Sequence, residues 1–319
     1  MPVTIRKMKV EDIGDVKRAD LLAWSALIES KYPEIKKFSP RTDQNIISYL
    51  HSDPEGAFVA IDDFAGIIGY SFSHIWGRTG WVGPLAVLPT RQGMGVGKEL
   101  LRSSLRHLED RGCTDIGLET MPESQINIGL YLGMGLRPEG LVVLFGKQIL
   151  KDGLKEVACD GLLIERFSES NVRNHLMSQI KRLSSTIHPG LDYTPEVNVT
   201  EEYSFGETLV ALSNGIAVGL CVVHTVSKRE DMPGSLVRVL AVTPGADNII
   251  VEALIHAAEL VTAEDRSIEL SIPVPGRNRK AMDVLLSREY TVVQTFERMM
   301  WQGSSGLASG GNNLCSWSG

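Results

Sequence analysis

Apolar and polar positions along the chain alternate between strand-like and helix-like patterns. Residues 85–88 are a continuous apolar run that ends at Pro89, which predicts a buried strand. Leucines recur at three- and four-residue steps from Leu100 to Leu108, which predicts a helix. Residues 91–98 lie between the two and contain three glycines that alternate with apolar residues. The pattern therefore predicts a glycine-rich turn that joins a strand to a helix.

This turn has the composition of an anion-binding site. Glycine leaves the backbone N–H groups unobstructed by Cβ, and the start of the helix adds about half a positive charge at the same point. A P-loop would have Ser or Thr after Lys98, where this chain has Glu99. A dinucleotide-binding fingerprint is Gly-x-Gly-x-x-Gly, with two residues between its second and third glycines. In this chain only one residue separates Gly95 from Gly97. A turn that binds nothing is the remaining alternative to a pyrophosphate site.

The same turn resembles the acetyl-CoA signature of the GCN5-related N-acetyltransferase (GNAT) superfamily, which is Gln/Arg-x-x-Gly-x-Gly/Ala. The chain matches it with Gln92-Gly93-Met94-Gly95-Val96-Gly97. The resemblance implies that acetyl-CoA is the co-substrate, that no metal ion is needed, and that the preceding strand splays from its neighbour to bind the coenzyme. The implied coenzyme-binding residues are Leu85, Ala86, Val87, Gln92, Gly93, Met94, Gly95, Val96, Gly97, Lys98, Ser124 and Tyr131.

A second motif follows about thirty residues later. Residues 115–120 alternate as a strand does, and residues 130–136, Leu-Tyr-Leu-Gly-Met-Gly-Leu, resemble the family's Leu-Tyr-x-x-x-Gly-Phe. The match implies that Tyr131 lies close to the thioester sulfur and protonates the leaving thiolate. Packing of a core tyrosine is the alternative. The family often has Asn seven residues before this Tyr, and this chain has Ser124 there, so that contact departs from the family pattern.

Glu119 is the candidate general base. It lies twelve residues before Tyr131, where the ribosomal-protein alanine acetyltransferases of this superfamily have a glutamate that serves as base. Leu118 and Thr120 point to the opposite face of the strand, so Glu119 can face the acceptor. An exposed strand glutamate is an equal alternative, and other members of the superfamily use water chains.

The element pattern of the first half recurs in the second. Residues 56–70 and 206–220 each predict a hairpin, the second with Asn-Gly at its turn. Residues 240–244, Leu-Ala-Val-Thr-Pro, repeat the strand that ends at Pro89. The second copy lacks the Gln/Arg and the Gly-x-Gly, and Asp247 stands near the helix start, where it would cap the helix and repel a pyrophosphate.

These patterns predict an α/β (α+β) fold of two GNAT-like domains in tandem. Each is expected to be a mixed, mostly antiparallel central sheet flanked by helices. The expected boundaries are 1–150 for an N-terminal GNAT domain that binds acetyl-CoA and 154–302 for a C-terminal GNAT-like domain without the pyrophosphate motif. A linker is expected near residues 151–153 and a flexible tail at 303–319. The second domain is expected to complete the acceptor site, because ligand sites often form between domains.

Composition narrows the class of protein. The chain has 319 residues, a net charge of −7 and four scattered cysteines without a C-x-x-C pair. The charge argues against nucleic acid as a partner, and no apolar run approaches the roughly 20 residues that span a membrane. The start is strand-like and unlike a signal peptide. We therefore expect a reduced, cytoplasmic protein in which basic residues such as Arg41 are solvated.

The function expected from the resemblance is direct transfer of an acetyl group from acetyl-CoA to a primary amine of a small-molecule or peptide acceptor. A non-catalytic acyl-CoA-binding or sensing protein is the main alternative, and a slow CoA-thioester hydrolase is a third. A homodimer is compatible with the sequence, although the duplicated domains can also mimic a dimer within one chain.

Overall fold

The computed structural model describes residues 3–31, 38–150, 154, 157, 161–227, 229, 234–265, 267–301 and 313–314. The expected linker at 151–153 lies outside these residues. The expected tail also lies outside them, except for Asn313–Leu314, which form the short strand β13 and pair with β10.

Ten helices and strands make up the first half of the described chain, beside two short 3-10 helices at Val10–Asp12 and Pro89–Arg91. They are β1 (Thr4–Lys7), α1 (Ile13–Lys31), α2 (Asp43–Ser52), β2 (Phe58–Asp62), β3 (Gly66–Trp76), β4 (Thr79–Val87), α3 (Val96–Asp110), β5 (Asp115–Thr120), α4 (Gln125–Gly133) and β6 (Leu136–Gln148).

The second half repeats this order of elements, as the sequence pattern predicts. Its elements are β7 (Leu162–Arg166), α5 (Arg173–Ile187), α6 (Thr194–Glu202), β8 (Gly206–Ser213), β9 (Ile216–His224), β10 (Ser235–Val242), α7 (Asn248–Glu264), β11 (Glu269–Pro275), α8 (Arg279–Ser287) and β12 (Thr291–Trp301).

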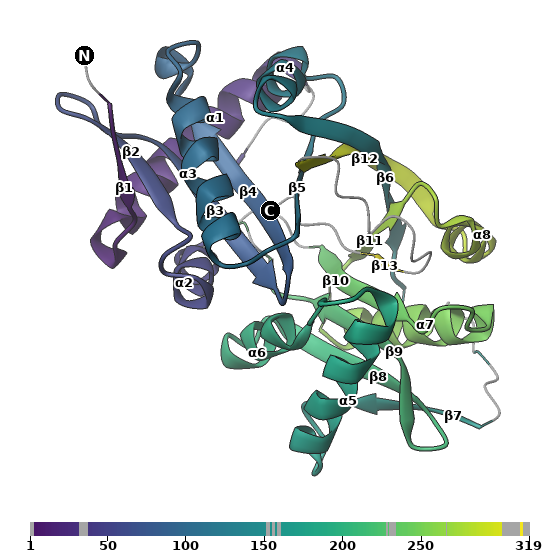
Figure 1. The fold of residues 1–319 in the computed structure, drawn as a ribbon. Coiled ribbons are helices and arrows are strands. Elements are labelled where there is room, and N and C mark those ends of the chain that lie inside the picture. The colour runs from purple at the N-terminus through teal and green to yellow at the C-terminus, as the bar shows by residue number, and fades with distance from the viewer. Residues whose placement is uncertain are drawn as a thin grey trace.

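One continuous sheet runs through both halves. Its strand order is β1-β2-β3-β4-β5-β12-β6-β11-β10-β9-β8-β7. The last strand of each half has crossed over, because β12 pairs with β5 of the first half and β6 pairs with β11 of the second. Figure 1 shows β12 in yellow beside β6 in teal, between the two halves. The mixed α/β fold is confirmed, but the two halves share one sheet and each supplies a strand to the other.

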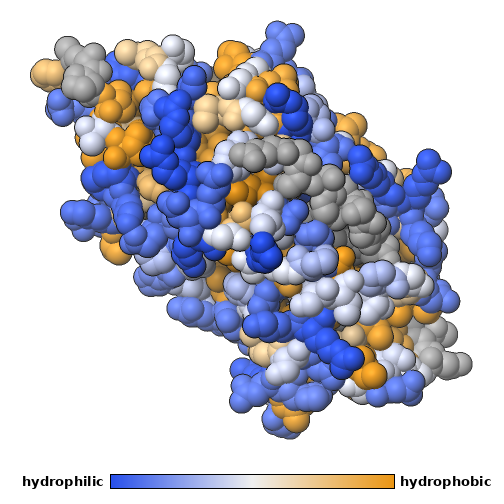
Figure 2. All heavy atoms as spheres, in the orientation of Figure 1, coloured by the Kyte–Doolittle hydropathy of each residue, from blue (hydrophilic) through white to orange (hydrophobic). Residues whose placement is uncertain are grey.

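Helix α3 covers one face of the first half's sheet. Its apolar stripe, Leu100, Leu101, Leu105 and Leu108, is buried, as the leucine spacing predicts. Lys98 and Glu99 are exposed, and Figure 2 shows hydrophilic side chains along the outward side of this helix. Such a sequence forms a helix because its apolar stripe is buried against the sheet while its polar side remains in water.

The opposite face of the sheet joins the two halves. Trp76 and Trp81 of the first half pack in one core cluster with residues of α5, β9 and β10, among them Leu176, Leu220 and Val239. This shared core holds the second half against Trp76 of β3 and Trp81 of β4. In the described part of the chain no helix is long and apolar enough to cross a membrane.

Candidate active site

The glycine-rich turn has a backbone that glycine alone adopts easily. Gly93 has φ +75° and Gly95 has φ +84°, both in the left-handed region, and no other atom lies within 4 Å of where a Cβ would be. Conformation, and not crowding, therefore requires glycine at both positions. The side chain of Gln92 stabilises the turn, since its Nε2 donates a hydrogen bond to the Val87 carbonyl at 3.1 Å.

The start of α3 is open to an anion. Gly95 is the residue before the helix, and no side chain caps the helix there. The first N–H groups of any α-helix, here those of Val96, Gly97 and Lys98, have no partner within the helix and point out of its start. Together with the helix dipole they give the helix start the chemistry that suits an anion. Coenzyme contacts of residues 92–98 remain a prediction.

Strands β4 and β5 separate toward this site. Their parallel ladder contains three pairs, from Thr79 with Asp115 to Trp81 with Gly117. Residues 85–87 lie beyond the last of these pairs and are bonded only to β3 on their other side within the sheet ladder. The edge of Leu85, Ala86 and Val87 that faces β5 is therefore available to a ligand, which is the splay that the resemblance implies.

Tyr131 lies next to the end of β5. It is buried on α4, whose first turn is capped by Ser124, since the Ser124 hydroxyl accepts the Asn127 N–H at 3.4 Å. Burial raises the pKa of Tyr131 to about 12, and a side-chain hydrogen bond with Thr120 opposes part of this rise. Tyr131 is thus a protonated phenol at neutral pH, and its partner Thr120 is the residue after Glu119 on β5.

Glu119 is buried and ion-paired. Its Oε1 accepts hydrogen bonds from Nε and Nη2 of Arg298 at 3.1 and 2.7 Å, and its side chain is 0% exposed. Arg298 comes from β12 of the second half, and its guanidinium lies 5.3 Å from the centre of the Trp81 ring. The alternative of an exposed strand glutamate is therefore wrong, and the role of Glu119 as a base remains a prediction.

Comparison with known proteins agrees with this geometry. The family model described as the acetyltransferase (GNAT) family matches residues 21–136, which include the turn, β5 and Tyr131. The chain therefore contains a GNAT-family domain over residues 21–136. Mycothiol acetyltransferase of Arthrobacter sp. (strain FB24) is 25% identical over 133 residues, which cover 39% of this chain. The match spans 41% of that relative's length.

Two solved structures resemble the chain over most of its length. A protein from Pyrococcus horikoshii has a TM-score of 0.71 at 17% identity and covers 98% of this chain and 94% of its own. A tandem GNAT protein from the clavulanic acid biosynthesis pathway has a TM-score of 0.61 at 15% identity, with 95% of this chain and 100% of that chain covered. At these identities the likeness shows a shared fold.

The second half differs from the first at two positions, the start of its helix α7 and the position that corresponds to Tyr131. Asp247 precedes α7, and its carboxylate accepts the Ile249 N–H at 3.1 Å, so the helix start is already capped by a negative charge. Asn278 caps α8 as Ser124 caps α4. Seven residues beyond Asn278 stands the buried Leu285, at the position that corresponds to Tyr131. The second half therefore lacks the uncapped helix start and the phenol, as the sequence predicts for its turn.

A buried charge cluster between the halves was not predicted. Asp20 on α1 accepts hydrogen bonds from the Arg41 guanidinium and the Tyr70 hydroxyl, and from Arg229 Nη1 at 3.2 Å. Arg41 is 1% exposed, so the expectation that it is solvated is wrong. Burial alone would raise the pKa of Asp20, but the charges of the two arginines outweigh it and lower that pKa. Burial and the nearby Arg41 lower the pKa of Arg229 to about 10.

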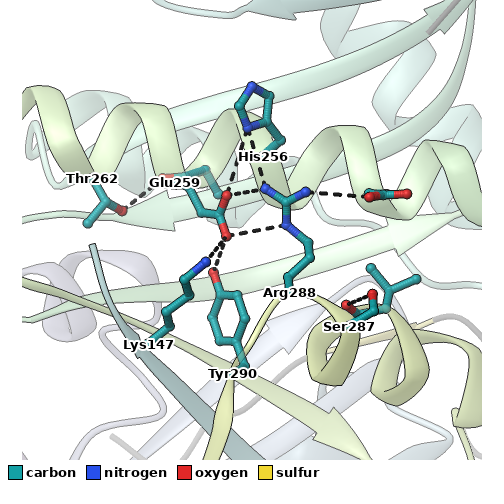
Figure 3. A network of polar contacts seen from close by, with 10 residues as sticks. Lys147, His256, Glu259, Thr262, Ser287, Arg288 and Tyr290 are labelled. Carbon is teal, nitrogen blue, oxygen red and sulfur yellow. Dashed lines mark hydrogen bonds and ion pairs between the residues drawn. The ribbon is translucent and has the colours of Figure 1, made fainter. Parts of the chain in front are cut away.

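A second buried network ties the crossed strand β6 to the second half (Figure 3). Glu259 on α7 is the centre and is ion-paired with Arg288. It also accepts a hydrogen bond from the Tyr290 hydroxyl at 3.2 Å and lies 3.7 Å from the ammonium group of Lys147 on β6. The network lies in the core of the second half, and it fixes a strand that comes from the first half. Among the described residues no group of three or more His, Cys, Asp or Glu side chains is placed to hold a metal ion.

Proposed function

We propose that this GNAT chain transfers an acetyl group from acetyl-CoA directly to a primary amine. The observation that carries the proposal is the uncapped start of α3 beside the free edge of residues 85–87. The diphosphate of the coenzyme would bind the backbone N–H groups of residues 92–98. The pantetheine arm would lie along Leu85, Ala86 and Val87, which brings the thioester between β4 and β5.

The residues around that position suit the chemistry of acyl transfer. Backbone N–H groups of β4 would bond the thioester oxygen and stabilise the negative charge that develops there when the amine attacks. The C–N bond forms, the C–S bond breaks, and the coenzyme leaves as a thiolate. Tyr131, a phenol whose pKa is about 12, would donate its hydrogen to that sulfur. Glu119, whose Oε1 is paired with Arg298, would accept the amine proton.

The acceptor is proposed to be a small-molecule or peptide amine. The names of the relatives support acetyl transfer in general, and the net charge of −7 suits a cationic acceptor better than nucleic acid. Cys113 and Cys221 are buried free thiols, which supports a reducing, cytoplasmic setting. The oligomeric state remains a prediction.

Release of free thiol from acetyl-CoA tests this function. The purified chain would be assayed with polyamines, amino acids, aminoglycosides and peptides that have free N-termini. Release that depends on one class of amine, with the acetylated amine found by mass spectrometry, supports the proposal. Amine-independent release would instead indicate a hydrolase. Tight binding of acetyl-CoA without release would indicate the non-catalytic sensor.

A further inference from the structure

A β-bulge on β6 places Glu139 beside the Glu119–Arg298 pair. On β6, Pro138 pairs with Met299 and Gly140 pairs with Arg298, so Glu139 has no partner of its own on β12. Two residues of β6 thus lie opposite one residue of β12, an arrangement that bends the strand and redirects its side chains. Glu119, Arg298 and the bulge follow one another across β5, β12 and β6.

The carboxylate of Glu139 is buried without a hydrogen-bond donor. Both of its oxygens are shielded from solvent, and neither accepts a hydrogen bond from the part of the chain that the structure describes. Arg277 is close, but its Nη2 donates to the backbone carbonyl of Glu139 at 3.2 Å. Burial raises the pKa of Glu139, and the charges of Arg298 and Arg277 oppose only part of that rise.

Such a group weakens the fold unless a ligand pairs with it. A buried carboxylate without partners costs free energy, whereas buried carboxylates that serve the fold are normally ion-paired. Glu119 and Glu259 of this chain are both paired with arginine. Glu139 is the exception among these three, which points to a cationic group that the described residues do not supply.

The position of Glu139 distinguishes this cation from the reacting amine. The reacting amine must reach the thioester at the end of β5, beside Tyr131 and Glu119. Glu139 lies two strands away, and two strand spacings amount to about 10 Å. One ammonium group cannot occupy both places, so an acceptor that uses both carries two amines separated by an alkyl chain.

We propose that Glu139 binds a second ammonium group of the acceptor, and hence that the acceptor is a diamine or polyamine. The inference rests on the proposed acetyl transfer and names its substrate class. Glu139 acts here as a specificity residue, because it pairs with the non-reacting end of the molecule and takes no part in bond formation. A charge-assisted hydrogen bond contributes about 1.5–3 kcal/mol, which corresponds to about 10- to 100-fold in affinity.

The experiment compares amines that differ by one charge. Acetyl transfer from acetyl-CoA to 1,5-diaminopentane and spermidine would be measured against 1-aminopentane, for the wild type, Glu139→Gln and the exposed control Glu109→Gln. We expect Glu139→Gln to raise the KM for the diamines about 10- to 100-fold and to leave kcat nearly unchanged. The 1-aminopentane kinetics should not change, and Glu109→Gln should behave as the wild type. Equal ratios of diamine to monoamine kcat/KM in wild type and Glu139→Gln would overturn the inference.

Two further measurements separate this inference from the proposed function. Calorimetric titration with 1,5-diaminopentane in the presence of CoA needs no turnover. Binding by the wild type that is lost in Glu139→Gln supports the inference, and absence of binding by the wild type overturns it even if another amine is acetylated. Thermal unfolding is the second measurement. Glu139→Gln should keep or raise the melting temperature because it removes an unpaired charge. A large decrease would show that Glu139 serves the fold, against the inference.

Discussion

Arg298 on β12 donates two hydrogen bonds to Glu119 on β5, at 3.1 and 2.7 Å, across 179 residues of sequence. The contact exists because β12 has crossed from the second half to complete the sheet of the first. The second half therefore contributes a charged side chain to the neighbourhood of Tyr131, and the two halves form one proposed active site. This arrangement explains why a half without a pyrophosphate-binding turn would be retained in the chain.

Removal of one partner of this pair should be costly. Arg298→Met removes the arginine that pairs with the buried Glu119 carboxylate, and loss of one partner of a buried ion pair costs about 3–5 kcal/mol of unfolding free energy. Chemical denaturation of Arg298→Met, of Glu119→Gln and of the double variant Glu119→Gln/Arg298→Met would measure the coupling energy between the two side chains. We expect the double variant to recover part of the loss. Strictly additive losses would mean that the two side chains do not stabilise each other.

The left-handed backbone at Gly95 yields a prediction for coenzyme affinity. Gly95→Ala forces a Cβ into a conformation that costs about 1–2 kcal/mol, and the turn should relax by moving its N–H groups. The dissociation constant of CoA, measured by calorimetry, should rise by about 5- to 30-fold. Gly112→Ala is the matched control, since Gly112 has φ +79° at the opposite end of α3. If both variants weaken CoA binding equally, the turn does not bind the coenzyme.

Tyr131 should affect the rate more than binding. Tyr131→Phe keeps the ring in its core cluster and removes only the hydroxyl, so we expect kcat to fall about 100-fold with little change in CoA affinity. Because the pKa of Tyr131 is about 12, its loss of a proton should not limit the rate between pH 6 and 10. Stopped assays of acetylated product would measure both. Tyr290→Phe, which removes another buried hydroxyl, should leave kcat unchanged, and wild-type turnover in Tyr131→Phe would exclude the acid role.

Local signals in the sequence predicted most of the fold. The leucine spacing of α3, the alternation of β5 and the Asn-Gly turn of the second hairpin each depend on residues close in sequence, and the structure confirms all three. The uncapped start of α3 and the capping by Asp247 follow from single positions at helix ends. In both cases the deciding interaction lies within one or two turns of the chain.

Pairing between distant segments could not be predicted in the same way. Nothing in the composition of β12 distinguishes a strand that stays with its own half from one that crosses to β5. The burial of Arg41 depends on Asp20, twenty-one residues earlier, and on Arg229, which comes from the other half. A single charged residue looks the same in sequence whether it is solvated or paired in a core. Partner choice is set by the tertiary fold.

The cluster around Asp20 makes stability depend on acid pH. The pKa of Asp20 in the folded chain lies below its ordinary value of 3.8, so the folded state binds this proton less readily than the unfolded state does. Ionised Asp20 therefore stabilises the fold above about pH 4, and this contribution is lost as pH falls through the lower, folded-state pKa. Asp20→Asn should lower the unfolding free energy by about 3–5 kcal/mol at pH 7 and flatten its dependence on pH below 4.

A matched variant checks that prediction. Arg229→Met leaves Asp20 paired with Arg41 and removes the arginine whose pKa is lowered to about 10, so it should destabilise less than Asp20→Asn. Denaturation at pH 7 and at several points below pH 4 would compare the two. Equal losses from both variants, with an unchanged acid dependence in Asp20→Asn, would show that the charge of Asp20 does not stabilise the fold.

Coenzyme stoichiometry tests the difference between the two halves. At the start of α7 the Asp247 carboxylate occupies the place where α3 offers its N–H groups, and a negative charge there repels a diphosphate. Leu285 in place of the phenol also leaves no hydrogen-bond donor for the sulfur. Calorimetry with CoA should therefore give one site per chain, and Gly95→Ala should weaken that single site. Asp247→Gly should not create another CoA site, because the second half also lacks the glycine-rich turn. Two equivalent CoA sites in the wild type would mean that the second half binds the coenzyme through groups other than an uncapped helix start.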